Sequence, residues 1–319
     1  MLVLPTLRQL QFFQALARRR SFSKAAADCL VSQSTLSSAI KELEAALGRQ
    51  LVDRSTRAFA LTPAGEETAA RAAPILAMAE DLARSAAERN PLEGPFRLGV
   101  IPTIAPFLLP KVAQRLKAAY PKLKLYLRED LTAALAERLA AGLLDAAVLA
   151  FPYPLAGAET IDIGEDPFWL AAPRNHPLIA RRSLKIADLE GENLLLLEDG
   201  HCLRDHAIEA CRLRRPEAAA AFGATSLFTL AQMAEAGLGP TLLPEMAVKS
   251  GLAEAAGLKA RRFASPAPVR KIGLGWRKGS GRRDEAEAIA AVFREALARN
   301  GREEKQSGRP AAKRAASPP

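Results

Sequence analysis

The sequence has few of the residue types from which catalytic and metal sites are usually built. Its 319 residues include three cysteines, three histidines, two tryptophans and three tyrosines. Three cysteines are too few for the disulfide framework of a small secreted protein. No apolar run approaches the roughly 18 residues that a membrane span requires, and the N-terminus lacks the basic segment and apolar core of a secretion signal. We therefore expect a cytoplasmic protein without a membrane partner.

Positive charge is concentrated at the two ends of the chain. The formal net charge is +10. Residues 1–62 contain nine Lys/Arg against four Asp/Glu, and the last 21 residues contain six against two, whereas residues 91–298 are nearly balanced at 27 against 24. A small basic N-terminal region favours a polyanion such as DNA as its partner. A generally basic surface would give the same totals, so charge alone is weak evidence.

The first fifty residues have the order helix, short helix, tight turn, helix. Apolar side chains repeat at helical spacing over residues 7–16, and a short helix is expected near residues 23–29. Ser32 can cap a third helix from Gln33 to Leu47, which Gly48 ends. This order predicts a helix-turn-helix whose third helix enters a major groove. A plain helical bundle with a serine-rich surface remains the alternative, because the signature is degenerate.

Small polar side chains at the start of the third helix suit contact with base edges, because they donate and accept without filling the groove. We expect DNA contacts from Ser32, Gln33, Ser34, Thr35, Ser37, Ser38 and Lys41.

A hairpin and a long helix are predicted next. Apolar pairs in residues 51–61 flank a basic turn, a wing whose Arg54 and Arg57 would reach phosphates or a minor groove. Pro63 then begins an alanine-rich helix that runs to about Glu88 and bends at Pro74. So long a helix beside a small domain is typical of a dimerising linker.

From residue 96 to residue 150, apolar strands alternate with helices, which predicts a parallel α/β arrangement. Further strands and helices follow, and two α/β lobes of this size usually hold a ligand or sensor site between them. The expected strands are residues 96–101, 123–127, 145–150, 168–172, 194–197, 221–224, 241–243 and 272–276. The expected helices are residues 103–119, 132–141, 203–213, 226–236 and 285–299. We expect the boundaries 1–62 for the DNA-binding domain, 63–90 for the linker helix, 91–300 for the two-lobed domain, and 301–319 for a disordered basic tail.

Two of the three cysteines lie close together in the sequence. The segment Gly200-His201-Cys202-Leu203-Arg204-Asp205 is followed by Cys211, nine positions after Cys202. Such a pair is compatible with a redox switch, a metal site or simple packing. A metal site would join Cys202 and His206 to His201 and Cys211, but neither a CxxC nor an HxxxH motif is present. We expect no metal and no cofactor, and we expect Cys29 to pack as a small apolar side chain.

The N-terminal hundred residues resemble LysR-type transcriptional regulators. The match runs through Ala25-Ala26, Val31-Ser32-Gln33-Ser34-Thr35-Leu36-Ser37, Ile40, Leu43-Glu44, Leu47-Gly48 and Leu61-Thr62-Pro63-Ala64-Gly65. Farther along, the chain resembles the hydrogen-peroxide-sensing members of that family. That match runs through Ile101-Pro102-Thr103, Leu108-Leu109-Pro110, Glu198–Asp205, Cys211, Ala224-Thr225-Ser226-Leu227 and Thr241-Leu242-Leu243-Pro244.

This resemblance implies an α/β protein with an N-terminal winged helix-turn-helix and a two-lobed regulatory domain like the periplasmic binding proteins. It implies a regulator of oxidative-stress genes and not an enzyme. The implied partners are double-stranded promoter DNA, hydrogen peroxide, RNA polymerase and a thiol reductant of the glutaredoxin or thioredoxin type. It also implies a homo-oligomer, a tetramer built as a dimer of dimers.

The resemblance also implies roles for individual residues. Cys202 would be the peroxide-reactive thiol, and Cys211 its resolving partner. The residues implied around the bound peroxide, together with the rest of the motif, are Thr103, Thr132, Gly200, His201, Leu203, Arg204 and Asp205. The chain departs from the family pattern at His206, where glutamine is common, at Phe107, where tyrosine is common, and at Ser34, where proline is frequent.

A thiolate attacks peroxide much faster than a thiol does, so this role predicts a lowered pKa for Cys202. Arg204 and the start of a helix at about Leu203 would favour the anion. In a continuous helix nine positions rise about 13.5 Å, whereas a disulfide needs Cα atoms within about 7 Å. Formation of a Cys202–Cys211 bond would therefore require the segment to unwind.

Two other function classes remain open. A thiol peroxidase would consume peroxide with many turnovers and would not need the N-terminal domain. A regulator that responds to a small metabolite would leave both cysteines without a role in the response.

Overall fold

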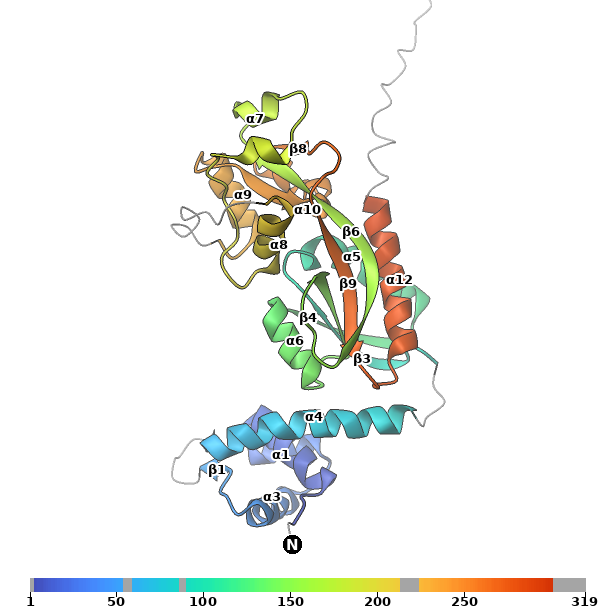
Figure 1. The fold of residues 1–319 in the computed structure, drawn as a ribbon. Coiled ribbons are helices and arrows are strands. Elements are labelled where there is room, and N and C mark those ends of the chain that lie inside the picture. Colours follow the sequence, from blue (N-terminus) through green and yellow to red (C-terminus); the bar gives the residue numbers. More distant parts are fainter. Residues whose placement is uncertain (1–2, 54–58, 86–89, 213–223, 301–319) are drawn as a thin grey trace, which may run out of the picture.

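The computed structural model describes residues 3–53, 59–85, 90–212 and 224–300. Three separate hydrophobic clusters form its cores. In Figure 1 the N-terminal helices lie at the bottom, the long helix α4 crosses above them, and the α/β region stands on the other side of α4. Within the described ranges, no helix combines the length and the apolar character that a membrane crossing needs.

The helix-turn-helix prediction agrees with the structure in its elements and its caps. Helices α1, α2 and α3 span Leu7–Arg19, Phe22–Asp28 and Gln33–Leu47. The Ser32 side chain accepts a hydrogen bond from the Thr35 backbone N–H at 3.1 Å and thereby caps α3. The buried members of α3 are spaced at three and four residues, which turns one face to the core; they are Leu36, Ile40 and Leu43.

A small hairpin and the linker helix follow as predicted. Strands β1 (Val52–Asp53) and β2 (Ala60–Leu61) pair antiparallel, and α4 spans Pro63–Ser85. Thr62 accepts from the Gly65 N–H at 3.0 Å and so satisfies one amide at the start of α4. The turn with Arg54 and Arg57, and residues 86–89 of the expected linker, lie outside the described residues.

One curved sheet runs through the α/β region in the order β4-β3-β5-β9-β6-β7, with β8 paired to β6. Its strands are β3 (Gly94–Val100), β4 (Leu123–Glu129), β5 (Ala146–Phe151), β6 (Ala158–Ala172), β7 (Thr241–Pro244), β8 (Lys259–Arg262) and β9 (Val269–Arg277).

The parallel arrangement expected for residues 96–150 is confirmed, but the sheet as a whole is mixed. Only β3 pairs parallel, with β4 and β5; the pairs β5–β9, β6–β9, β6–β7 and β6–β8 are antiparallel. The reason is that β6 leaves the first lobe and β9 returns to it, so these two strands lie side by side in opposite directions (Figure 1). Both strands therefore belong to both lobes.

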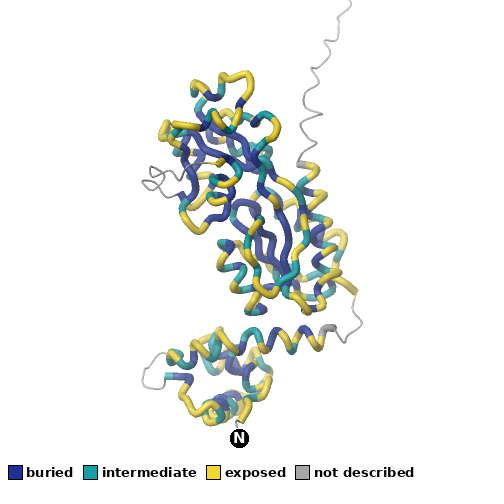
Figure 2. The backbone as a smooth tube through the Cα atoms, in the orientation of Figure 1, coloured by how far each residue is buried: buried dark blue, intermediate teal, exposed yellow. Residues whose placement is uncertain are grey.

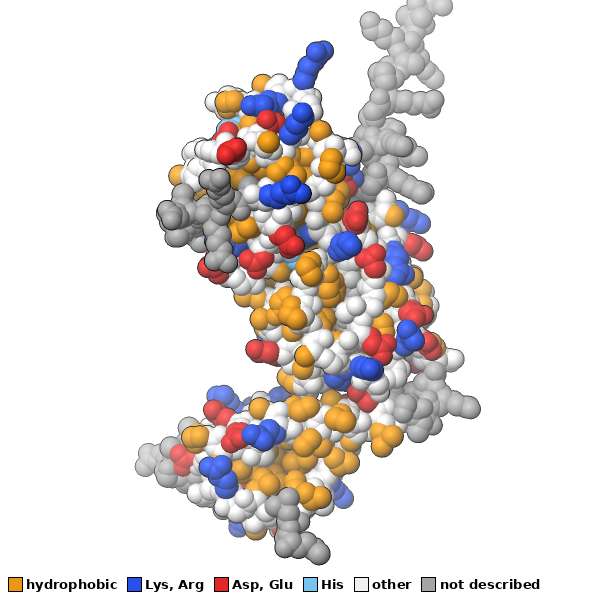
Figure 3. Space-filling view, viewed as in Figure 1, with side chains coloured by type: hydrophobic (Ala, Val, Ile, Leu, Met, Phe, Trp, Pro, Cys, Tyr) orange, Lys and Arg blue, Asp and Glu red, His pale blue; other side chains and the backbone are white. Residues whose placement is uncertain are grey.

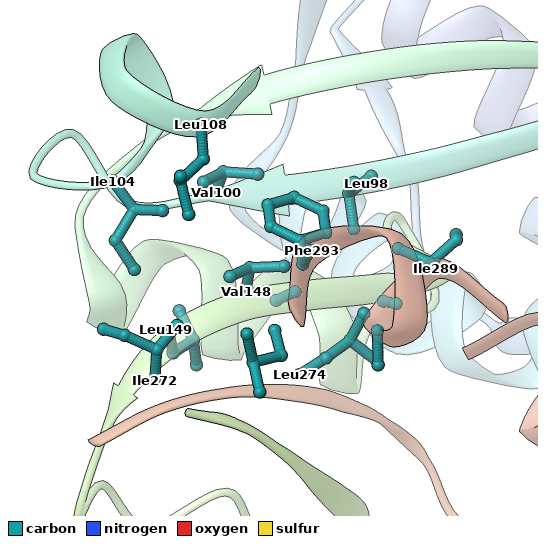
Figure 4. Packing of buried hydrophobic residues seen from close by; sticks show 14 of the residues in the cluster. Leu98, Val100, Ile104, Leu108, Val148, Leu149, Ile272, Leu274, Ile289 and Phe293 are labelled. Carbon is teal, nitrogen blue, oxygen red and sulfur yellow. The ribbon is translucent and has the colours of Figure 1, made fainter. Parts of the chain in front are cut away.

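The first lobe, which we call lobe I, is built on β3, β5 and the lower part of β9. Helix α5 (Ala105–Ala119) and helix α12 (Arg283–Asn300) pack on this sheet, and α6 (Thr132–Ala140) contacts β5. Figure 4 shows side chains from these strands and from α12 interlocking around Phe293. The central strands are buried along their length, as the dark tube in Figure 2 shows.

Lobe II is built on the end of β6, on β7 and on β8. Helices α8 (Cys202–Ala210), α9 (Leu227–Glu235) and α10 (Glu245–Lys249) complete its core. The predicted strand at 194–197 is reduced to isolated bridges at Leu195 and Leu197, and of the expected strand 221–224 only Ala224 is described. Strand β8 and the part of β6 before Phe168 were not expected, because their charged residues hide the strand pattern.

The linker helix contacts lobe I directly. Asp81 of α4 accepts a 2.9 Å hydrogen bond from Arg277 of β9, and both side chains are largely buried. Gly142 lies so close to Ala77 that a Cβ at this glycine would fall 2.0 Å from the alanine Cβ. Strand β9 therefore connects the inside of the α/β region with the helix that leads to the DNA-binding elements.

Candidate functional site

Cys202 is the first residue of α8 and lies where the two lobes meet. Its side chain is buried at 9% exposure and belongs to the hydrophobic cluster of lobe I. The next residue, Leu203, belongs to the cluster of lobe II. Helix α8 packs against β9, so the thiol faces the strand that joins both lobes.

Groups from three other elements surround the Cys202 sulfur. The Thr132 hydroxyl at the start of α6, the Ala150 backbone at the end of β5 and the Arg270 charge on β9 each favour its thiolate form. The Thr132 hydroxyl is buried and, among the described residues, has no hydrogen-bond partner of ordinary geometry. It is thus available to a small polar molecule beside the thiol.

Arg270 is completely buried and is held by several acceptors. It donates to the Asp166 carboxylate at 2.9 and 3.0 Å, to the Thr103 hydroxyl at 2.8 Å and to the Thr103 carbonyl at 3.0 Å. The Met246 N–H donates to the other Asp166 oxygen at 3.0 Å. A guanidinium fixed in this way keeps its position and its positive charge beside the thiol.

The sequence-based choice of Arg204 as the nearby positive charge is therefore corrected. Arg204 donates to the Leu197 carbonyl at 3.2 Å and pairs with the Asp199 carboxylate at 3.1 Å. The charge that acts on Cys202 comes from Arg270, a strand residue 68 positions later in the chain.

The expected lowering of the Cys202 pKa is also corrected. Burial raises the pKa of this thiol above its ordinary value of 9.0. Thr132, Arg270 and Ala150 oppose this effect but do not outweigh it. Cys202 is consequently a protonated thiol near neutral pH, and a fast reaction would depend on how the oxidant is positioned, not on a resting thiolate.

This protonation state has a measurable consequence for pH dependence. A raised pKa keeps the thiolate fraction small throughout the neutral range, so the rate of Cys202 alkylation is expected to rise about tenfold per pH unit from pH 7 to pH 9. The measurement is the iodoacetamide rate in a Cys29→Ser/Cys211→Ser double variant. A rate that levels off below pH 7 would show a lowered pKa instead.

Cys211 lies at the opposite end of α8 as its C-terminal cap, buried at 2% exposure in the cluster of lobe II. Burial raises the pKa of its thiol to about 12. Both cysteines are free. Since α8 is continuous between them, their Cα atoms are separated by a rise of about 13.5 Å, and the two thiols lie in different cores.

Two histidines flank Cys202 on the helix. His201 is the N-cap of α8, and burial lowers its pKa. His206 lies one turn after Cys202; the residue is 6% exposed, and its Nε2 lies 3.4 Å from the Pro152 carbonyl oxygen. Burial and the Arg270 charge lower the His206 pKa, so both rings are neutral at pH 7.

The remaining predicted site residues divide into two groups. Thr103 and Thr132 are both buried. Thr132 acts on the Cys202 thiol directly, whereas Thr103 accepts a hydrogen bond from Arg270, whose charge acts on the same thiol. Gly200 and Asp205 are exposed, and Gly200 has φ +96°, a conformation that glycine adopts without strain. The residues proposed to contact DNA on α3 are exposed except Ser37, which is half-buried.

Among the described residues, no group of three His, Cys, Asp or Glu side chains is arranged to hold a metal ion. Cys29 is half-buried against the N-terminal cluster, as expected for a packing residue.

Sequence reasoning missed Arg270, although the sequence contains a signal for it. In β9, Arg270 shares its strand face with Ile272, Leu274 and Trp276, all of which are buried. An arginine that occupies an inward-facing position of a strand, among alternating apolar residues, is a candidate for a buried charge that has a partner. Its partners could not be read from the sequence, because Asp166 and Thr103 are 104 and 167 positions away.

Comparison with known proteins agrees with this organisation. Residues 7–66 match the family model described as bacterial regulatory helix-turn-helix protein, lysR family, and residues 89–298 match the LysR substrate binding domain. A probable hydrogen peroxide-inducible genes activator of Streptomyces viridosporus is 42% identical over 92% of this chain and 95% of its own. The regulator EstR of Acinetobacter baylyi is 38% identical over 92% of this chain and 98% of its own.

Solved structures give the same assignment. A full-length OxyR variant from Pseudomonas aeruginosa superposes with a TM-score of 0.76 at 35% identity, covering 91% of this chain and 98% of that one. A peroxide-bound OxyR variant from Corynebacterium glutamicum gives 0.64 at 36% identity, covering 96% and 98%. The chain therefore belongs to the LysR family of transcriptional regulators and is of the OxyR type.

Proposed function

We propose that this protein is a DNA-binding transcriptional activator that senses hydrogen peroxide by reversible formation of a Cys202–Cys211 disulfide and controls oxidative-stress genes. The observation that carries the proposal is the placement of Cys202 at the junction of the lobes, beside the buried Arg270 and an unsatisfied Thr132 hydroxyl. The peroxide-inducible relatives support the choice of oxidant.

The proposed chemistry has two steps. The Cys202 sulfur attacks one peroxide oxygen, the O–O bond breaks, and a sulfenic acid and water result. The Cys211 thiol then attacks the sulfenic sulfur, which forms the disulfide and releases a second water. We assign Thr103, Thr132, Gly200, His201 and Leu203 to the binding of peroxide, with Arg204 and Asp205 at the outer edge of the site.

The second step requires that α8 come apart. The two thiols belong to different cores and are separated by a whole helix. Moreover, a Cys211 pKa of about 12 leaves almost no thiolate while the helix is folded. Unwinding exposes the thiol, returns its pKa toward the ordinary value and brings the two residues together. Disulfide formation is therefore coupled to a local refolding, which can carry a signal.

The contact between β9 and α4 offers a route for that signal. Arg270 lies on β9 beside Cys202, and Arg277 on the same strand holds Asp81 of the linker helix. Helix α4 also exposes Ile75 and Met78 at 47% and 71%. Figure 3 shows hydrophobic side chains gathered over the region of α4. We assign this face to a homodimer contact, with two dimers forming a tetramer.

We propose that α3 reads a promoter operator. Its exposed polar side chains are Ser32, Gln33, Ser34, Thr35, Ser38 and Lys41, with Ser37 half-buried beside them. Arg54 and Arg57 remain proposed wing contacts to the backbone or the minor groove. The proposed division of the chain is 1–62, 63–90, 91–300 and 301–319. RNA polymerase, a glutaredoxin- or thioredoxin-type reductant and a cytoplasmic location complete the proposal.

A metabolite-responsive regulator is the second candidate. The similarity to EstR covers as much of this chain as the similarity to the peroxide-inducible activators, so overall identity does not decide the effector. That candidate requires both cysteines to be irrelevant to the response, whereas the buried charge beside Cys202 favours the redox role.

The deciding experiment combines disulfide mapping with DNA footprinting on the same samples. Stoichiometric peroxide is expected to produce a Cys202–Cys211 peptide and, at the same time, a changed footprint. Slow oxidation without a footprint change would favour the metabolite regulator. Many turnovers of peroxide per protein with thioredoxin present would identify a thiol peroxidase instead.

A further inference from the structure

The Cys202 site contains a buried basic group to which the steps above assign no role. His206 lies four positions after Cys202, and both side chains are on the buried face of α8. Side chains four apart on a helix have Cβ atoms about 5–6 Å from each other. The end of β5 contacts both residues, because the Ala150 backbone faces the Cys202 sulfur and the Pro152 carbonyl faces His206.

The hydrogen bonding of His206 defines which nitrogen carries its proton. The Pro152 carbonyl can only accept, so the Nε2 that lies 3.4 Å from it is the protonated nitrogen. Nδ1 then carries a free lone pair. This atom is buried, and among the described residues it has no hydrogen-bond partner. Buried unsatisfied acceptors are costly and uncommon, and at a reactive site they suggest a ligand or a proton to be received.

Attack by Cys202 on peroxide produces a need for such an acceptor. The sulfur is protonated in the resting state because burial raises its pKa, so its proton must leave as the S–O bond forms. The departing oxygen leaves as hydroxide and needs a proton to become water. A neutral imidazole can accept the first proton and supply the second, which is the usual work of a histidine in acid–base catalysis.

We propose that Nδ1 of His206 accepts the proton released when Cys202 attacks peroxide and returns it to the departing hydroxide. The inference rests on the proposed peroxide-sensing function and adds a proton-transfer residue to it. The overall reaction converts the thiol and hydrogen peroxide into the sulfenic acid and one water, and His206 is neutral both before and after the step.

The charged groups around His206 are consistent with a transient proton carrier. Arg270 on β9 disfavours the imidazolium, whereas Asp205 and Glu209 on α8 favour it. Burial is the largest influence: it lowers the pKa of His206 although the hydrogen bond with the Pro152 carbonyl raises it, so the ring is neutral at rest and Nδ1 is free to accept. When the proton arrives, the Arg270 charge favours its rapid return to hydroxide.

The test is the pH dependence of sulfenic acid formation in His206→Gln, measured in full-length Cys211→Ser protein. Glutamine, the residue common at this position in the family, preserves hydrogen bonding but cannot take a proton, so the variant tests whether this chain depends on its histidine. We expect the variant to react about 100-fold more slowly than its parent at pH 7, with the difference narrowing toward pH 9 as solvent deprotonates the thiol. His176→Gln, at the N-cap residue of α7 (Pro177–Ala180) outside the site, should match the parent.

Three outcomes separate the possibilities. A rate deficit that is constant across pH, or none at all, overturns the proton-transfer role while leaving peroxide sensing intact. A parent protein that reacts with peroxide no faster than free cysteine overturns the proposed function itself. Should His206→Gln unfold, His206→Ala with added imidazole serves instead: recovery of the rate by imidazole at pH 7 supports the proposal, and a folded variant without recovery contradicts it.

Discussion

Replacing Cys202 with serine is expected to abolish the response to peroxide while leaving DNA binding intact. A serine hydroxyl has nearly the same size but cannot be oxidised to a sulfenic acid, so no disulfide forms and α8 remains folded. The DNA-binding helices have their own hydrophobic cluster, which does not include this site. The measurement is a footprint on promoter DNA with and without peroxide, which should be identical for the variant.

Two further variants serve as controls for Cys202→Ser. Cys211→Ser should still form the sulfenic acid on Cys202 but should not form the disulfide, which separates sensing from signalling. Cys29→Ser, in the N-terminal cluster, should respond as the parent does. A Cys202→Ser protein whose footprint still changes with peroxide would exclude this thiol as the sensor.

Replacing Arg270 with methionine should have the largest effect on folding stability. Arg270 and Asp166 are 0% and 1% exposed and form a 2.9 Å ion pair. Methionine would leave the Asp166 carboxylate buried without its partner, which typically costs about 3–5 kcal/mol of unfolding free energy. The variant should also lose most of its reactivity with peroxide, because the fixed charge beside Cys202 is gone. Chemical denaturation and stopped-flow oxidation measure the two effects.

The double variant Asp166→Asn/Arg270→Met separates the loss of folding stability from the loss of reactivity with peroxide. Removing both charges is expected to recover much of the stability, since the penalty arises from the lone carboxylate and not from loss of the pair. Reactivity should stay low. Arg115→Met removes a more exposed ion pair with Glu295 and should change stability by less than about 1 kcal/mol. If Arg115→Met and Arg270→Met lowered the unfolding free energy equally, burial would not be the cause of the larger loss expected for Arg270→Met.

The parts of the fold that the sequence predicted well are those encoded by near neighbours. Helix α3 begins after Ser32 and ends at Gly48 as expected, because a side-chain cap and a left-handed glycine act within one turn. The direction of the strands was predicted less well. Strand β9 pairs with β5 and β6 in an order that only the return of the chain from lobe II establishes.

The candidate site shows the same division. The motif around Cys202 and the spacing to Cys211 identified the helix and the chemistry to test. The sequence pointed to Arg204 as the positive charge beside Cys202, but Arg204 is held by the Leu197 carbonyl and the Asp199 carboxylate, and the charge comes from Arg270 on a strand far along the chain. The direction of the pKa shift was wrong for a related reason: burial depends on how the two lobes close around the thiol.

The sequence by itself determined that a helix-turn-helix precedes an α/β region and that two cysteines lie nine positions apart. Periodicity, helix caps and residue spacing are local properties, so they can be read from the sequence without knowledge of the fold. The tertiary structure alone decided that Arg270 and Thr132 meet at Cys202, that His206 keeps a free Nδ1, and that the two thiols occupy different cores. These features depend on burial and on contacts between residues distant in the chain, which no local pattern specifies.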